Sequence, residues 1–111
     1  MKINLKKYNL KKKCILITGA AGLLGSQFGI ALLEAGAKVI MTDINIKGLA
    51  NFKKKFSKKF KSQNIQSFKL DVTSEQSIKN LLKRFEEEKI KIDVLINNAC
   101  LNPKFKKNFT K

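Results

Sequence analysis

A glycine-rich break between an apolar strand and an apolar helix constrains the fold of this chain more than any other feature. The four residues CILI at 14–17 form a short apolar run, which is typical of a buried parallel strand. Thr18 follows, and glycines stand at positions 19, 22 and 25. Apolar residues then recur at helical spacing until Gly36, where a helix is expected to stop. These residues are Leu24, Phe28, Ala31, Leu32 and Ala35.

Each glycine of this turn has a physical use if the turn binds a dinucleotide. Gly19 allows a tight reversal from strand to helix, and Gly25 lets the helix pack closely on the strand. Gly22 has no Cβ, so the backbone can come close to a pyrophosphate, which would meet the free N–H groups of the new helix. A plain strand–turn–helix unit with accidental glycines is the alternative, and the agreement of strand, helix and a later acid favours dinucleotide binding.

That acid is Asp43, which ends a second apolar run, Val39 to Met41. A carboxylate at this strand end can accept hydrogen bonds from a ribose diol and would repel a 2′-phosphate. No arginine follows Asp43, which favours NAD over NADP, while Lys47 is close enough to keep NADP open.

Three motifs resemble those of the short-chain dehydrogenase/reductase family. They are TGAAGLLG at 18–25, Asp71-Val72-Thr73 and Asn97-Asn98-Ala99. The resemblance covers the chain from Lys13 to about Pro103 and implies an NAD(P)-dependent oxidoreductase, which transfers hydride between a nicotinamide and a carbonyl or alcohol substrate. It implies that Asp71 and Val72 lie against adenine and that the paired amides border the nicotinamide ribose. The family usually has glycine at the next position, where this chain has Cys100. The candidate cofactor-binding residues are Thr18, Gly19, Gly22, Leu23, Leu24, Gly25, Asp43, Ile44, Asp71, Val72, Asn97, Asn98 and Ala99.

The remaining elements alternate between helix and strand. Helices are expected at 46–60 and 74–89, and strands at 65–70 and 92–96, with a turn at 62–64. Thr73 and Gln76 have capping-box spacing before the later helix. The chain therefore predicts an α/β fold, a Rossmann-like partial doubly wound parallel sheet of the form βαβαβαβ with strand order 3-2-1-4. The stripes expected to be buried are Leu49, Phe52, Phe56 and Phe60 in the first of these helices, and Ile78, Leu81, Leu82 and Phe85 in the second.

The net charge of +16 raises the question of nucleic acid or another anionic surface. Nearly all of the excess is lysine and Arg84 is the one arginine, which weakens a nucleic-acid function. We interpret the lysines as solvated surface and keep a non-catalytic nucleotide- or nucleic-acid-binding module as the alternative.

The basic start and following apolar run also resemble a signal peptide, but a strand and amphipathic helix explain them better. No segment has the roughly 18 apolar residues of a membrane span. The chain has no histidine, so no ordinary zinc site is expected. Two cysteines without redox spacing indicate a cytoplasmic protein.

The sequence divides into a basic, mobile lead-in at 1–12, an NAD-binding domain at 13–100 and a lysine-rich tail at 101–111, where we expect a truncation point. The resemblance implies a catalytic serine, tyrosine and lysine after the Asn97-Asn98 pair, and none follows in a matching context. Tyr8 and Lys12 have the Y-x-x-x-K spacing but precede the first strand, so we interpret them as coincidence. We therefore expect no catalytic residues in these 111 residues, weak cofactor binding and no turnover, whereas the complete protein is expected to be a homo-oligomer. An open edge at the fourth strand and exposed apolar surface beside the last helix are also expected.

Overall fold

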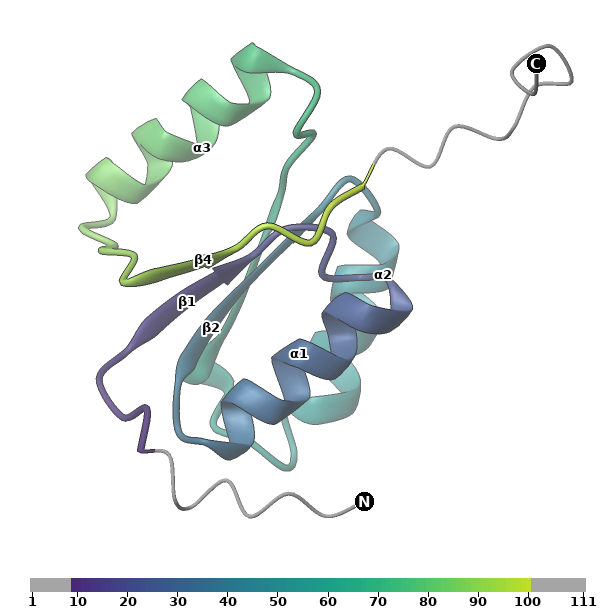
Figure 1. Cartoon of the computed structure of the whole chain (residues 1–111), viewed down its shortest axis with the longest axis vertical. Coiled ribbons are helices and arrows are strands. Elements are labelled where there is room, and N and C mark those ends of the chain that lie inside the picture. Colours follow the sequence, from purple (N-terminus) through teal and green to yellow (C-terminus); the bar gives the residue numbers. More distant parts are fainter. Residues whose placement is uncertain (1–8, 101–111) are drawn as a thin grey trace, which may run out of the picture.

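Four parallel strands form one sheet in the order β3-β2-β1-β4, as the sequence predicts. The computed structural model describes residues 9–100 (Figure 1). The strands are β1 (Cys14–Ile17), β2 (Lys38–Asp43), β3 (Ile65–Lys69) and β4 (Val94–Ile96). The helices are α1 (Leu23–Glu34), α2 (Ile46–Phe56) and α3 (Glu75–Glu87), and a 3-10 turn, η2 (Ser62–Asn64), precedes β3. The predicted fold class, a Rossmann-like parallel sheet, is confirmed.

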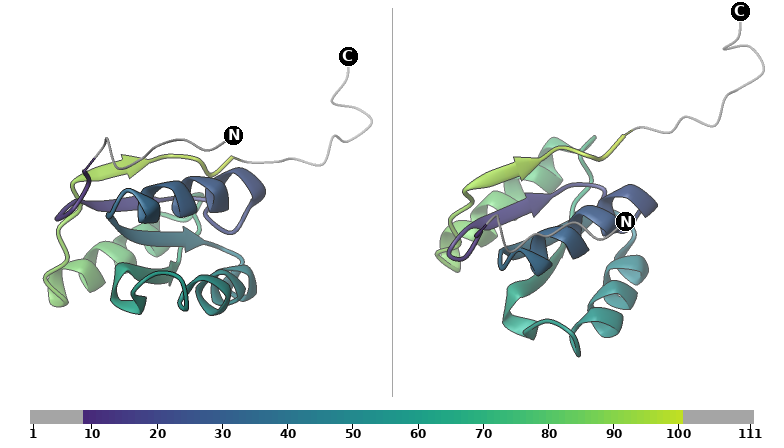
Figure 2. Two further views of the ribbon diagram at one scale, coloured as in Figure 1. Left: turned by 90° about the horizontal axis from the view of Figure 1, so that it is seen from below. Right: turned by 60° about the horizontal axis from the view of Figure 1, so that its bottom comes forward.

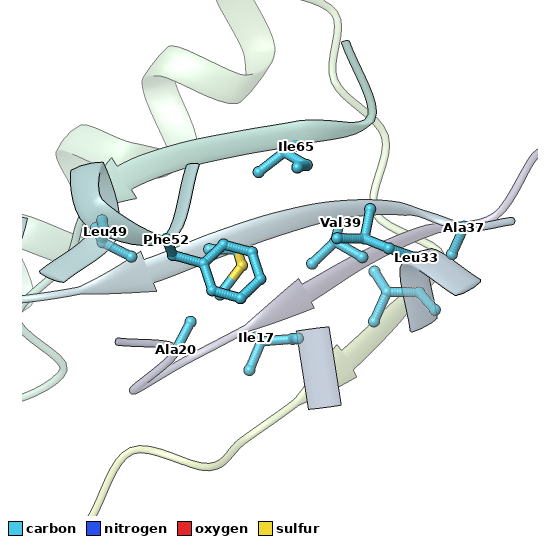
Figure 3. Close-up of a cluster of buried hydrophobic side chains, with 10 residues drawn as sticks. Ile17, Ala20, Leu33, Ala37, Val39, Leu49, Phe52 and Ile65 are labelled. Carbon is cyan, nitrogen blue, oxygen red and sulfur yellow. The ribbon is translucent and has the colours of Figure 1, made fainter. Parts of the chain in front are cut away.

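The sheet separates two hydrophobic layers. Helices α1 and α2 cover one face and α3 lies on the other (Figure 1). On the first face, Leu33 of α1 and Leu49 and Phe52 of α2 pack against strand residues such as Ile17 and Ile65 (Figure 3). On the second face, the smaller cluster is built from Ile40, Leu70, Leu81 and Phe85. Because all four strands are parallel, their carboxyl ends meet at one edge of the sheet.

Helix α1 packs through its glycines rather than through its larger apolar residues. Gly25, Gly29 and Leu33 form its buried side. Leu24 and Phe28, which helped to predict the helix, are exposed. A Cβ on Gly29 would lie 3.2 Å from the Met41 sulfur, so the helix lies so close to the sheet that a side chain there would require Met41 to shift by a few tenths of an ångström.

Helix α2 is shorter than the predicted span of 46–60, because its last turn opens at Ser57, which is the C-cap. The chain then turns, with the Phe60 N–H donating to the Phe56 carbonyl at 3.0 Å. Both rings still pack partly buried against the core, so the predicted apolar stripe of this segment is confirmed.

Helix α3 differs from its prediction in two respects. Its N-cap is Ser74, whose hydroxyl accepts a hydrogen bond from the Ser77 N–H at 3.1 Å, so the predicted cap at Thr73 is wrong. Of the predicted buried stripe, Leu81 and Phe85 are buried, while Leu82 is 59% exposed. Ile78, the fourth member of that stripe, is also exposed. Only one side of the helix therefore meets the sheet.

Strand β4 lies at the outer edge of the sheet, beside β1 (Figure 2). Its Leu95 is paired in register with Leu16 and is 58% exposed. Exposed apolar side chains on β4 and α3 agree with the expected uncovered surface beside the last helix. Within residues 9–100, no helix has both the length and the apolar character that crossing a membrane requires.

Candidate functional site

A cavity of about 600 Å³ opens where the four strands end. Ligands of open α/β sheets bind in this place, outside the carboxyl ends of the strands. Its walls come from the glycine turn after β1, the ends of β2 and β3 and the segment after β4. The lining residues are Gly19, Gly22, Leu23, Leu24, Asp43, Ile44, Leu70, Asp71, Val72, Thr73, Asn98, Ala99 and Cys100.

The three glycines of the turn meet different surroundings. Gly19 has φ +63°, a left-handed conformation that glycine adopts without strain, and this makes the sharp reversal possible. A Cβ on Gly25 would lie 2.4 Å from the Gly19 carbonyl oxygen and 2.8 Å from the Ala20 Cα, so α1 begins directly on the turn. A Cβ on Gly22 would meet only the Gly19 oxygen, at 3.4 Å. Protein packing therefore explains Gly25 but gives no reason for a glycine at position 22.

Thr18 joins the glycine turn to the end of β4. Its buried hydroxyl accepts hydrogen bonds from the N–H groups of Asn98 (3.0 Å) and Ala99 (2.9 Å). It donates to the Asn97 side-chain oxygen at 3.2 Å. The Asn98 side-chain amide donates to the Gly19 carbonyl at 3.2 Å. One donor and two acceptors are all that a hydroxyl has, so Thr18 is fully used within the protein.

The first turn of α1 points at the cavity without a side-chain cap. Asn45 caps α2 and Ser74 caps α3, each with a side-chain oxygen. The N-cap residue of α1 is instead Gly22, which has no side chain that could accept a hydrogen bond. The first backbone N–H groups of a helix have no intrahelical partner and carry a positive partial charge. This end of α1 can therefore receive an anionic group.

Asp43 lies at the end of β2, and its carboxylate is already held by the backbone. Its Oδ2 accepts from the Ala21 N–H and its Oδ1 from the Asn45 N–H, each at 2.9 Å. An ionised carboxylate has about four acceptor positions, so each oxygen keeps capacity for one more donor. The group is thus oriented by the fold and remains able to accept hydroxyl groups from a ligand.

Asp71 lies at the end of β3, and two hydrogen bonds from Thr73 hold its carboxylate. The Thr73 hydroxyl (2.6 Å) and backbone N–H (2.9 Å) both donate to Asp71 Oδ1. The Thr73 side-chain bond, followed by its backbone bond, lowers the pKa of Asp71 below its ordinary value. Thr73 therefore holds the Asp71 carboxylate in one orientation beside Val72, where its other oxygen can accept a hydrogen bond.

Apolar side chains line the rest of the cavity and are exposed to solvent. Leu23 is 85% exposed, Leu24 and Ile44 are more than half exposed, and Val72 is exposed to a smaller extent. Large exposed apolar groups around a hollow with a few fixed polar groups are typical of small-molecule sites. The cavity therefore combines an uncapped helix start, two oriented carboxylates and apolar walls.

Of the residues predicted from sequence, all but three line this cavity. Thr18 and Gly25 lie beneath the turn and support it, and the Asn97 oxygen is directed at Thr18. Sequence reasoning did not place Leu70, Thr73 or Cys100 among the cofactor-binding residues. The Asp-x-Thr spacing was the available signal for Thr73, since a threonine two residues after an aspartate can close a local turn on its carboxylate.

Two neighbouring features complete the description of the site. A second hollow of about 550 Å³ lies between β3 and α3 and shares Ile44 and Asp71 with the cavity. Cys100 is exposed at the cavity, whereas Cys14 is half-buried in β1, where burial raises the pKa of its thiol. Across residues 9–100, no group of three or more acidic, cysteine or histidine side chains is placed to hold a metal ion.

A family model described as short chain dehydrogenase matches residues 13–111. Among curated proteins, 15-hydroxyprostaglandin dehydrogenase [NAD(+)] from Macaca fascicularis is 33% identical over 90 residues, which are 81% of this chain and 34% of that protein. The chain therefore spans about a third of the length of the curated relatives that it matches.

Solved structures agree with the sheet and its helices. 2-Keto-3-deoxy-D-gluconate dehydrogenase from Streptococcus agalactiae is 25% identical with a TM-score of 0.77, over 94% of this chain and 38% of that one. The Pseudomonas aeruginosa RhlG/NADP active-site complex is 26% identical with a TM-score of 0.74, over 85% and 37% of the two chains. One relative is thus named for NAD and one neighbour was solved with NADP.

Proposed function

The chain belongs to the short-chain dehydrogenase family, and from that premise we propose that it forms the NAD-binding part of an oxidoreductase. In the reaction that we propose, hydride passes between the nicotinamide and a carbonyl or alcohol carbon of a small substrate. The observation that carries the proposal is the uncapped start of α1 at Gly22, open to the cavity and flanked by Asp43.

In this proposal, different residues of the cavity bind different parts of the cofactor. The N–H groups at the start of α1 hold the pyrophosphate, and Gly22 leaves room for it. Asp43 accepts hydrogen bonds from the hydroxyls of the adenosine ribose. Asp71 accepts a hydrogen bond from the exocyclic amine of adenine, while Val72 faces the adenine ring. Asn98 and Ala99 border the nicotinamide side.

Thr18, Gly25 and Asn97 have a supporting function in the proposal. The buried Thr18 hydroxyl fixes the backbone of the segment after β4, and Gly25 fixes the distance between α1 and the turn. Both parts of the cavity therefore keep their spacing before a ligand enters, which lowers the entropic cost of binding.

NAD is the proposed cofactor because of the charge at the end of β2. Asp43 would repel the 2′-phosphate of NADP, and the cation nearest in sequence, Lys47, is a solvent-exposed residue of α2. The chain's single tyrosine, Tyr8, lies outside the described residues. The proposal therefore assigns cofactor binding to this sequence and assigns it no catalytic residue.

Titration of the 111-residue chain with NADH tests the proposal. NADH is fluorescent itself, so the change in its emission reports its binding, and the chain has no tryptophan to act as an energy donor. We expect saturable binding that falls at least about tenfold in Asp43→Ala, the scale of one hydrogen bond to a charged group. Glu34→Gln is the matched control, because it removes one negative charge at the far end of α1. An Asp43→Ala chain that binds NADH like the parent would refute the proposed site.

The second candidate, a nucleic-acid-binding module, is favoured by one observation. In the part of the chain that the structure describes, ion pairs engage only Lys59, Lys79 and Arg84 among the many cations. A salt titration of single-stranded DNA binding distinguishes the two functions, since phosphate-backbone binding weakens steeply with salt. Tight DNA binding unaffected by Asp43→Ala, with no NADH binding, would favour this second function.

A further inference from the structure

Asp43 does not hold its orientation alone, since the two donors on its carboxylate come from separate segments. Ala21 belongs to the glycine turn, and Asn45 is the N-cap residue of α2. The carboxylate therefore bridges the turn and the helix, and its orientation depends on the distance between them.

Asn45 fixes the start of α2 from its own side chain. Its Oδ1 accepts the Gly48 N–H at 3.0 Å, while its backbone N–H donates to Asp43 Oδ1 at 2.9 Å. A single residue thus ends the loop after β2, caps the helix and supplies one of the two donors on the carboxylate.

Gly48 sets the distance between α2 and the glycine turn. A Cβ at this position would lie 2.8 Å from the Ala21 Cβ and 2.8 Å from Asn45 Nδ2. Both distances are too short for a real Cβ, so a side chain would push the first turn of α2 away from Ala21. Ala21, Asp43, Asn45 and Gly48 consequently form a closed ring of contacts.

We propose that Asn45 and Gly48 are positioning residues, which keep Asp43 oriented so that this chain discriminates NAD from NADP. The inference rests on the proposed function. While the Ala21 and Asn45 N–H groups both donate to it, the Asp43 carboxylate cannot rotate, and its remaining acceptor positions face a ribose diol. When the ring is opened, one donor is lost, the carboxylate can rotate, and a 2′-phosphate meets less repulsion.

Dissociation constants for NADH and NADPH, measured in parallel, test the inference. The readout is the ratio of the NADPH constant to the NADH constant, because a general loss of stability weakens both cofactors alike. Asn45→Ala keeps the backbone N–H that donates to Asp43 but removes the cap that holds it in place, and Gly48→Ala displaces it. If that N–H moves out of reach of the carboxylate, we expect the ratio to fall about tenfold in each variant, the scale of one hydrogen bond to a charged group. Asn45→Ser keeps a capping oxygen and is expected to retain the parent ratio.

Ser74→Ala is the matched control. This variant removes the side-chain cap of α3, and Ser74 makes no hydrogen bond to Asp43. It should therefore leave the ratio of the NADPH and NADH dissociation constants unchanged, even if the affinities for both cofactors fall. A thermal melt of each variant verifies folding. If Gly48→Ala does not fold, Asn45→Ala still carries the test, because it changes only an exposed side chain. Equal losses for both cofactors in the Asn45 and Gly48 variants would overturn this inference alone. A parent chain that binds neither cofactor would overturn the proposed function as well.

Discussion

One added methyl group, placed at Gly25 or at Gly22, separates the structural use of the glycine turn from its use in binding. In Gly25→Ala the new carbon would lie 2.4 Å from one backbone atom and 2.8 Å from another, and neither can move without displacing the turn. Overpacking of this kind costs about 1–3 kcal/mol. Alanine recovers at most about 1 kcal/mol of helix propensity. Because the 2.4 Å contact is with a backbone oxygen, the cost lies near the upper end of that range, and we expect Gly25→Ala to lower the free energy of unfolding by about 2–3 kcal/mol.

Gly22→Ala should behave differently, because its Cβ would be in ordinary van der Waals contact at 3.4 Å. Its φ of −78° suits alanine. The poorer N-cap preference of alanine costs about 0.5–1 kcal/mol. The lower entropy of its unfolded chain returns about the same amount, 0.4–1 kcal/mol. The free energy of unfolding should therefore change by less than about 1 kcal/mol.

Urea unfolding followed by far-UV circular dichroism measures the stability of both variants, and NADH titration measures their binding. Both variants are expected to lose NADH affinity, Gly25→Ala through a displaced turn and Gly22→Ala through a methyl group where the pyrophosphate would lie. Retained NADH affinity in a stable Gly22→Ala chain would refute our explanation of Gly22. A Gly25→Ala chain as stable as the parent would refute the packing argument.

Three further predictions follow from single contacts. Thr18→Val keeps the shape of the side chain but leaves two N–H groups after β4 without an acceptor, and we expect a loss of about 1–3 kcal/mol in urea unfolding; an unchanged midpoint would contradict this. Iodoacetamide should modify the exposed Cys100 faster than Cys14, whose pKa is raised by burial. The two cysteines are expected to be alkylated at equal rates only when urea has unfolded the chain; equal rates in the folded chain would contradict this. The lowered pKa of Asp71 means that the native carboxylate binds protons more weakly than the unfolded chain does, so its contribution is complete above about pH 4 and is lost as the pH falls further. Melting temperatures measured down to about pH 2 should fall less steeply in Asp71→Asn than in the parent.

The sheet could be predicted from sequence because buried parallel strands appear as continuous apolar runs. The first strand has the predicted bounds, Cys14–Ile17, and the strand order is the one expected of a doubly wound fold with a glycine turn after its first strand. The cavity was predictable for the same reason. Once the strand order is known, motifs that follow β1, β2, β3 and β4 must meet at one edge.

Side-chain packing was harder to predict. The buried side of α1 is made by Gly25 and Gly29, which carry no hydrophobic signal, because the helix approaches the sheet too closely for Leu24 or Phe28. Periodicity identified the helix but could not show how closely it packs. Leu82 lies outside the buried side of α3 for a related reason, since the sheet meets only one side of that helix.

Hydrogen-bond partners could not be predicted from motif spacing alone. Thr73 has capping-box spacing, yet its hydroxyl donates to Asp71 and the neighbouring Ser74 caps α3. Asn97 belongs to a motif that predicts cofactor contact, yet its oxygen accepts from Thr18. Thr73 had two possible partners close in sequence, and Thr18 is 79 residues from Asn97, so in both cases only the folded backbone shows which contact forms.

The most direct test of the account is an NMR titration of the isotopically labelled 111-residue chain with NAD. We predict saturable shifts of the backbone amides around the cavity, with Gly19, Gly22, Asp43, Val72 and Ala99 among them, and little change at the opposite end of the sheet near Cys14 and Lys38. Shifts that follow the lysines of α2 instead, or no shifts from a folded chain at high NAD concentration, would contradict a dinucleotide site at the ends of these strands.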